Sequence, residues 1–176
     1  MVLLRTLRLD QPGAAEKLMR VSLEAKAASA LNSPNIAGVL GGGKAGDVYV
    51  VGWEFVEGVK LSTTLERGEA FSPSEFTDLS RQICSGLDHA HSKAVIHPEL
   101  KPGNIILEWD GTAKLLDFGL PRKPASGIEI SEALHYISPE ELQGKQPGPR
   151  ANLFSWGAIL YQMRSEERRV GKECRL

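Results

Sequence analysis

This sequence contains few cysteines, no excess of either charge and no long apolar run. Its two cysteines, Cys84 and Cys174, lie 90 positions apart and show no metal-ligand spacing, which favours a reducing compartment over a disulfide scaffold. The 21 basic and 22 acidic residues nearly cancel, so no electrostatic signal indicates nucleic acid or an anionic membrane as a partner. Apolar runs fall well short of the roughly 20 residues that span a bilayer. We therefore expect a soluble, cytoplasmic protein.

What the sequence does contain is typical of one ordinary globular domain. A chain of 176 residues, 41% of them hydrophobic and 24% charged, is long enough to bury a core. It shows no internal repeat. The order of its segments predicts a mixed β/α first part and a mainly helical second part.

Three segments carry apolar residues at helical spacing. In residues 14–31 the apolar face also contains Glu24, and a carboxylate on such a face needs a partner. The run Ser72-Pro73-Ser74-Glu75 combines a capping box with proline at the first helical position, so a second helix is predicted to begin there. An apolar stripe continues this helix over residues 76–90, and a last helix is predicted over 153–162.

Short strands are predicted before, between and after the first two helices. Residues 2–4 are interpreted as the end of a buried strand. Two further strands, joined by a glycine-rich turn at 41–46, are predicted at 36–40 and 48–55. Three more strand-like pieces follow the second helix, at 95–96, 105–107 and 114–116, and Asp110-Gly111 is a hairpin-turn signal between the last two.

Three motifs in the second half carry the chemistry. They are His97-Pro98-Glu99-Leu100-Lys101-Pro102-Gly103-Asn104, then Asp117-Phe118-Gly119, then Ser138-Pro139-Glu140. In this order, with 13 positions between Asn104 and Asp117, the set resembles the catalytic loop, the metal-binding motif and the end of the activation segment of protein kinases. Each motif alone is a weak signal, whereas the ordered set is strong. The amino-acid sequence of the second half is most similar to that of bacterial serine/threonine kinases.

The resemblance implies a partial bilobal kinase-like fold of the α+β class. Residues 1–56 would form an incomplete small lobe that ends in the hinge, and residues 57–163 an incomplete large lobe. The hinge would begin at Trp53, in the position called the gatekeeper. Glu24, 29 positions earlier, matches the glutamate of the family's C-helix, and Arg5, another 19 positions back, stands where the family carries a lysine.

The resemblance also implies ATP and Mg²⁺ as cofactors and a protein as substrate or partner. Glu99 would accept the proton of the substrate hydroxyl, and Lys101 would lie near the transferred phosphoryl group. Asn104 and Asp117 supply the hard oxygen ligands that suit Mg²⁺. The remaining residues expected around the nucleotide are Leu3, Arg5, Glu24, Glu54, Val56 and Ile106.

Several of these positions depart from the family pattern. Glu99 replaces an aspartate, which displaces the carboxylate by about an ångström, and such a shift can lower a rate on the order of a hundredfold. Arg5 replaces the phosphate-gripping lysine, an exchange that is not conservative at a tight site. Leu3 replaces a small alanine, Pro98 an arginine and Asn152 an aspartate that braces the catalytic loop.

These departures leave three functional interpretations open. The first is a serine/threonine kinase with impaired phosphoryl transfer, the second is a pseudokinase that binds or scaffolds a partner, and the third is a degraded reading frame. We expect the 176 residues alone to be inactive. The substrate and the oligomeric state are not indicated by the sequence.

Two segments are set aside in this interpretation. Residues 41–48 fit the kinase phosphate loop by letter, but they follow the Glu24 helix, whereas that loop should precede Val2; we interpret them as a turn between two strands. Residues 164–176 break from the family pattern, and their back-translation is similar to a sequencing adapter read in frame. We interpret this tail as non-native and expect further helices to follow residue 163 in the complete protein.

Overall fold

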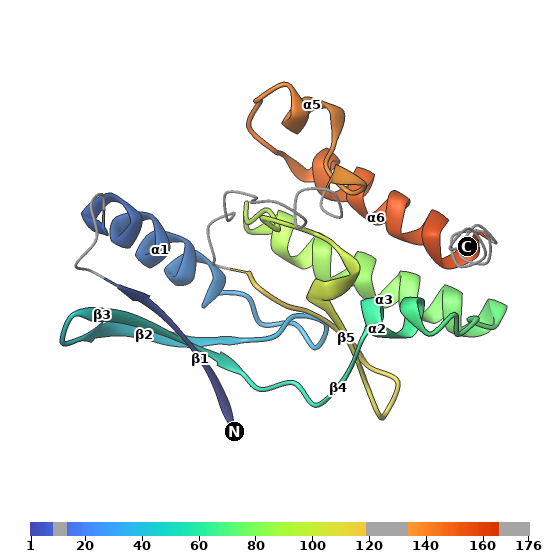
Figure 1. The fold of residues 1–176 in the computed structure, drawn as a ribbon, viewed down its shortest axis with the longest axis horizontal. Helices are drawn as coiled ribbons and strands as arrows, with labels where there is room; N and C mark the ends of the chain where they lie inside the picture. Colours follow the sequence, from blue (N-terminus) through green and yellow to red (C-terminus); the bar gives the residue numbers. More distant parts are fainter. Residues whose placement is uncertain (9–13, 119–133, 166–176) are drawn as a thin grey trace, which may run out of the picture.

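The first half of the chain forms a three-stranded antiparallel sheet with one helix beside it. The computed structural model describes residues 1–8, 14–118 and 134–165. Strands β1 (Val2–Arg8), β2 (Val39–Ala45) and β3 (Val48–Glu54) form the first sheet in the order β1-β3-β2. Helix α1 (Ala14–Ala28) runs alongside this sheet (Figure 1) and turns Val21, Ala25 and Ala28 inward. The helix therefore lies where its apolar periodicity predicts, although it ends before residue 31.

The glycine-rich run is a strand, which corrects the predicted turn at 41–46. Residues 41–45 belong to β2 and pair with β3 as far as Ala45 opposite Val48. The turn is therefore reduced to Gly46 and Asp47, and Gly46 adopts a φ of 59°, which glycine tolerates without strain. Glycines at 41–43 leave this hairpin exposed to solvent. The run is thus one strand of a hairpin in the first sheet, and not the connection between two strands.

The strand at the start of the chain is exposed, although the sequence predicted a buried one. Val2 is 50% exposed and Leu4 63% exposed. Within the described residues, β1 pairs with β3 on one side, so it forms an edge of the sheet. The apolar residues of β1 pair with β3, but they are not buried on both faces of the sheet.

A second antiparallel sheet follows the hinge. It consists of β4 (Gly58–Lys60), β5 (Ile105–Glu108) and β6 (Ala113–Leu115), in that order. The predicted turn at Asp110-Gly111 is present: the Thr112 amide donates to the Asp110 side chain at 2.8 Å, and Gly111 has a φ of 88°. The short helix α2 (Leu61–Glu66) follows β4 directly.

The longest helix, α3 (Pro73–Ser92), begins with the predicted capping box. The Ser72 hydroxyl accepts from the Glu75 amide at 3.3 Å, and the Glu75 carboxylate accepts from the Ser72 amide at 2.8 Å. Leu79, Ile83 and Leu87 bury its apolar stripe. The capping box and the apolar stripe, both local sequence signals, thus define where this helix begins and which face it buries.

The strand predicted at 95–96 is absent, because the chain there closes the end of α3. Ala94 adopts a φ of 56°, and the Val95 amide donates back to the Ala90 carbonyl at 2.9 Å. Such a return ends a helix in the way that a left-handed residue after the last turn usually does. The apolar residues 95 and 96 therefore close the end of α3 and do not form a strand.

Two more helices complete the described part. They are α5 (Pro139–Leu142) and α6 (Pro149–Arg164), and the second includes the predicted segment 153–162. Helix α6 lies beside α3 (Figure 1), and Trp156 and Ile159 join the core from it. Within the described residues no helix is long and apolar enough to cross a membrane.

Asn35 connects the segment between α1 and β2 to the second sheet and to α3. Its side-chain Nδ2 donates to the Gln82 side chain and to the Ala113 carbonyl, both at 3.0 Å. Its carbonyl accepts from the Leu115 amide at 2.9 Å, and Ile36 forms a bridge with Leu115. The segment after α1 is therefore part of the second sheet's hydrogen-bond network. The buried Asn35 side chain thus fixes the segment that leads into β2 against the second sheet and α3.

We predict that Gly58→Ala destabilises the fold. A Cβ at Gly58 would lie 2.2 Å from the Leu107 carbonyl oxygen, so β4 would have to separate from β5 at the residue that enters the second sheet. Overpacking of this kind costs roughly 1–3 kcal/mol, which urea unfolding would measure. Gly157→Ala is the control: a Cβ there meets nothing within 4 Å in α6, and removing a helical glycine should stabilise the chain by about 1 kcal/mol. A Gly58→Ala chain as stable as the parent would contradict the close approach.

Candidate active site

Asn152 of α6 holds the start of the catalytic loop. Its Oδ1 accepts from the His97 amide at 2.9 Å, and its Nδ2 donates to the His97 carbonyl at 2.9 Å. The same Oδ1 lies 3.0 Å from Nε2 of His91, so that imidazole nitrogen is the donor. The amide thus performs the bracing that the family resemblance assigns to an aspartate, through two bonds to the backbone of one residue.

The imidazole of His97 is buried and neutral. Its Nε2 donates to the Leu116 carbonyl at 2.8 Å, and its Nδ1 accepts from the Glu99 amide at 3.1 Å. The ring meets Phe118 edge-on, with centroids 4.7 Å apart. Burial lowers the pKa of His97 to about 4, although the Leu116 carbonyl and Glu99 raise it in part. His97 is therefore a packing and orienting group and not an acid or base at neutral pH.

Glu99 and Lys101 form an ion pair on this loop. The Lys101 ammonium lies 3.0 Å from the Glu99 carboxylate, and both side chains are partly exposed. The Asn104 side chain closes the loop by donating from Nδ2 to the Glu99 carbonyl at 2.7 Å. The three residues expected to be catalytic are therefore brought together, with the carboxylate and the ammonium side by side.

The backbones of Asn104 and Leu116 are bonded where β5 and β6 adjoin. The Leu116 amide donates to the Asn104 carbonyl at 2.9 Å, which places the next residue, Asp117, beside Asn104. Asp117 has a φ of 63°, a left-handed conformation that costs a residue other than glycine roughly 1–2 kcal/mol. Strain of this kind persists where the surroundings dictate the backbone, and it is frequent at functional sites.

This pair of side chains fits a magnesium ion. Because Nδ2 of Asn104 is bonded to the loop, the ligand atom that its amide presents is Oδ1. An amide oxygen with a carboxylate from Asp117 is the hard donor set that Mg²⁺ takes, usually with water and phosphate oxygens completing the shell. Among the described residues no cluster of three or more histidine, cysteine or acidic side chains could hold a metal ion.

The residues expected near the phosphates and adenine come from the first sheet and α1. In the β1–β3 register Leu3 lies opposite Trp53 and Arg5 opposite Val51. Trp53 and Val51 are buried, and Leu3 is 42% exposed. The Arg5 side chain lies outside the described part, and Glu24 is half-buried on α1. The backbone therefore puts Leu3 and Arg5 at the predicted strand positions.

The hinge glutamate is held by side-chain contacts that the sequence did not reveal. The Lys114 ammonium pairs with the Glu54 carboxylate, and the Gly38 amide donates to it at 3.0 Å. Partial burial by itself raises the pKa of Glu54, but the hydrogen bonds from Lys114 and Gly38 and the charge of Lys114 outweigh this, so the pKa lies below its ordinary value. Lys114 also lies 3.8 Å from Glu108. Its position in an alternating strand gave no signal of this role.

The other two expected adenine contacts flank this hinge. Val56 is buried, and Ile106 of β5 is half-buried and lies between Lys60 and Lys114 in the sheet register. Neither of the two cavities beside the catalytic loop is lined by Leu3, Val56 or Ile106. Ile106 pairs with Lys60 of β4, the strand that directly follows the expected hinge.

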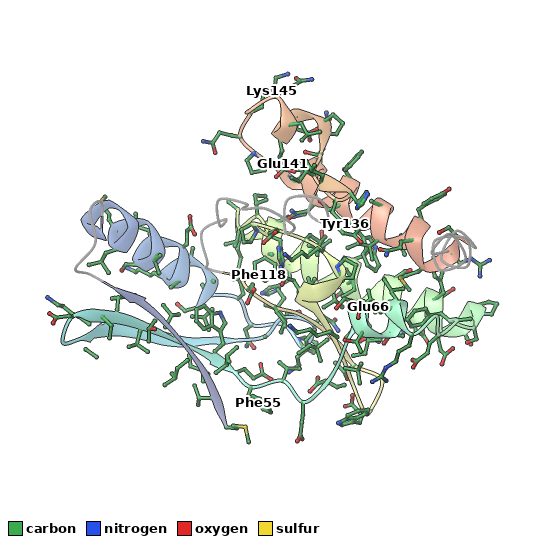
Figure 2. All side chains as sticks on the ribbon, in the orientation of Figure 1. Phe55, Glu66, Phe118, Tyr136, Glu141 and Lys145 are labelled. Atoms are coloured by element: carbon green, nitrogen blue, oxygen red, sulfur yellow. The ribbon has the colours of Figure 1, made fainter. Side chains whose placement is uncertain are left out.

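A cavity of about 470 Å³ opens beside Lys101. Its walls come from α2, the single-turn 3₁₀ helix Pro102–Asn104, the segment before α5 and helix α6. Glu66 and Tyr136 are among its lining residues, and Figure 2 shows both on the α6 side of Phe118. Sequence reasoning did not single out this cavity.

Some expected residues lie outside the described part of the chain. These are Gly119 of the metal-binding motif and residues 166–176 of the tail. Ser138, which opens the third motif, is buried and caps α5 through Glu141, with its hydroxyl donating to that carboxylate at 2.8 Å. The third motif is therefore a helix start.

We predict that the neutral state of His97 makes stability fall in mild acid. The pKa of His97 is about 4 in the folded chain and about 6.5 in an unfolded one. The unfolded state binds more protons between these values, so the contribution present above about pH 6.5 is lost as the pH falls toward about 4. Urea titrations should give a free energy of unfolding about 2 kcal/mol lower at pH 5 than at pH 7.5.

Two variants test whether His97 is responsible for this pH dependence. His97→Gln should flatten it, because the titrating group is removed. His135→Gln, which alters an exposed imidazole, should leave it unchanged. Equal slopes for both variants would contradict the assignment.

Comparison with known proteins agrees with this geometry. A sequence model of the protein kinase domain matches residues 2–173. The serine/threonine-protein kinase PrkC of Bacillus subtilis is 29% identical over 167 residues, covering 92% of this chain and 26% of the relative. A probable serine/threonine-protein kinase of Streptomyces coelicolor is 30% identical over 174 residues, with 92% and 26% covered. The chain thus spans about a quarter of the length of these curated relatives. It belongs to the protein kinase domain family.

Proposed function

We propose that this domain binds ATP with Mg²⁺ and transfers the γ-phosphoryl group to serine or threonine hydroxyls of a protein, at a much reduced rate. The observation that carries the proposal is the grouping of Glu99, Lys101 and Asn104 on one braced loop, with Asp117 beside Asn104. Phosphoryl transfer depends on positioning and charge neutralisation more than on covalent work. ATP as donor also implies a cytoplasmic domain.

Each residue has a role in this reaction. The substrate hydroxyl oxygen attacks the γ-phosphorus, the bond to the β,γ-bridging oxygen breaks, and ADP leaves with the electron pair. Glu99 accepts the hydroxyl proton, and Lys101 neutralises charge on the transferred group. Asn104 and Asp117 would hold Mg²⁺, which when bound neutralises charge on the phosphates.

The reduced rate follows from the position of the base. A glutamate carries its carboxylate one methylene further from the backbone than the expected aspartate, and a displacement of about an ångström can cost on the order of a hundredfold in rate. Here the Glu99 carboxylate also lies 3.0 Å from the Lys101 ammonium, so the proposed base is already engaged in an ion pair on its own loop.

A pseudokinase that binds a protein partner is the second candidate. The observation that favours it is that Asn152 keeps the catalytic loop braced without an acidic group, so the fold is preserved at a position where the family resemblance expects an aspartate. In this case nucleotide binding, phosphoryl transfer or both would be lost, while the surface that binds the protein partner is retained.

We predict that Glu99→Asp raises phosphoryl transfer in the complete protein. Restoring the shorter carboxylate should increase kcat on the order of ten- to a hundredfold, measured as transfer of labelled γ-phosphate to a protein substrate with Mg²⁺ or Mn²⁺. Asp117→Ala should abolish transfer, because it removes a metal ligand. Lys145→Ala, which changes an exposed side chain beyond α5, is the control and should leave the rate unchanged.

The same assays separate the two candidates. No transfer by the parent, by Glu99→Asp or by the combined Arg5→Lys, Glu99→Asp variant would exclude the kinase and favour the pseudokinase. Robust transfer by the parent that Asp117→Ala removes would exclude the pseudokinase. Equal activity of the parent and Glu99→Asp would show that the longer carboxylate is not the impairment.

A further inference from the structure

Trp53 connects the first sheet to the segment that carries Asp117. It lies at the end of β3, is 3% exposed, and donates from Nε1 to the Phe118 carbonyl at 3.2 Å. Phe118 is 1% exposed, and its ring is also held edge-on by His97. Figure 2 shows Phe118 in the middle of the molecule, between the two sheets. The hydrogen bond thus reaches from the small lobe to a backbone carbonyl directly after the metal-binding aspartate.

The backbone around Asp117 is fixed from both sides. Before it, the Leu116 amide donates to Asn104 at 2.9 Å, and the Leu116 carbonyl accepts from His97 at 2.8 Å. After it, the Phe118 carbonyl accepts from Trp53. Asp117 itself has a φ of 63°, a conformation that persists where the neighbouring peptide groups are held in place. Trp53 supplies the contact on the far side of this strained residue.

A purely structural role for Trp53 is the alternative explanation. A buried tryptophan contributes a large apolar surface to a core wherever it lies, and its N–H usually finds an acceptor. Trp156 of α6 provides the comparison within this chain. It is also 3% exposed, yet its Nε1 makes no hydrogen bond to any residue in the described ranges. The two indoles are therefore equally buried, and they differ in the hydrogen bond that Trp53 donates to Phe118.

We propose that Trp53 is a positioning residue that holds Asp117 in its metal-binding conformation through the Phe118 carbonyl. The inference rests on the proposed function, because Asp117 is there a ligand of Mg²⁺. It adds a residue of the small lobe to the metal site without any contact between Trp53 and the ion. Loss of the indole N–H should weaken the response to Mg²⁺ more than the affinity for the nucleotide itself.

The test compares Trp53→Phe with Trp156→Phe in the complete protein. Each removes an indole from the core, but only the first removes a hydrogen bond to the Phe118 carbonyl. Binding of ADP with a fluorescent ribose label is measured in EDTA and at increasing Mg²⁺. We expect the Mg²⁺ concentration for half-maximal binding to rise about three- to tenfold in Trp53→Phe, the range for one lost hydrogen bond. Trp156→Phe should keep the parent value, and metal-free affinity should be similar in all three proteins.

Two results would overturn the inference while leaving the proposed function intact. One is an unchanged Mg²⁺ dependence in Trp53→Phe, and the other is an equal change in Trp156→Phe, which would indicate a general loss of packing. If Trp53→Phe fails to fold, the benzothienylalanine analogue of Trp53 replaces it, because sulfur takes the place of the N–H in a ring of nearly the same shape.

A second measurement does not depend on nucleotide binding. Hydrogen exchange of the Leu116 amide, followed by NMR, reports how firmly the segment before Asp117 is bonded to Asn104. Loss of the Trp53 N–H should accelerate this exchange about three- to tenfold, and Trp156→Phe should not. If the parent binds no nucleotide with Mg²⁺, the proposed function fails, and the exchange rates still decide whether Trp53 positions the segment. Equal rates in all three proteins would overturn the inference.

Discussion

The arrangement of the site depends on one buried, uncharged imidazole. His97 is bonded through its ring to Leu116 and Glu99, through its backbone to Asn152, and by edge-on contact to Phe118. These partners belong to the catalytic loop, the end of the second sheet and helix α6. A proton on Nδ1 would remove the acceptor for Glu99 and place a charge where burial opposes it. The loop is therefore assembled only around the neutral ring.

Two side-chain amides make further long-range connections. Asn152 joins α6 to the catalytic loop, and Asn35 joins the segment between α1 and β2 to the second sheet and to α3. A primary amide donates and accepts at once, so it can bond both the backbone N–H and the backbone C=O of one residue. It also avoids the cost of burying an ion. The replacement of an expected aspartate by Asn152 is thus compatible with a braced loop.

Local signals in the sequence predicted the helices and the catalytic loop, whereas long-range contacts escaped it. The capping box at Ser72 and the ordered motifs involve neighbouring residues, so their pattern is visible in the chain. Strand β1 is apolar but lies at an edge, and 95–96 is apolar but ends α3; composition does not distinguish these from buried strands. The bonds of Lys114 and Trp53 join residues at least 60 positions apart, and no spacing rule connects them.

The anchoring of Asn35 restricts how α1 can move. The chain leaving α1 is bonded to the second sheet and α3, so a displacement of the helix is a swing about its C-terminal end, and each residue moves in proportion to its distance from that pivot. At 1.5 Å per residue, Glu24 lies four residues or about 6 Å from Ala28, and Ala14 fourteen residues or about 21 Å. The same swing therefore moves the start of the helix more than three times as far as Glu24. The position of α1 is therefore fixed most closely at its C-terminal end and least closely at its start.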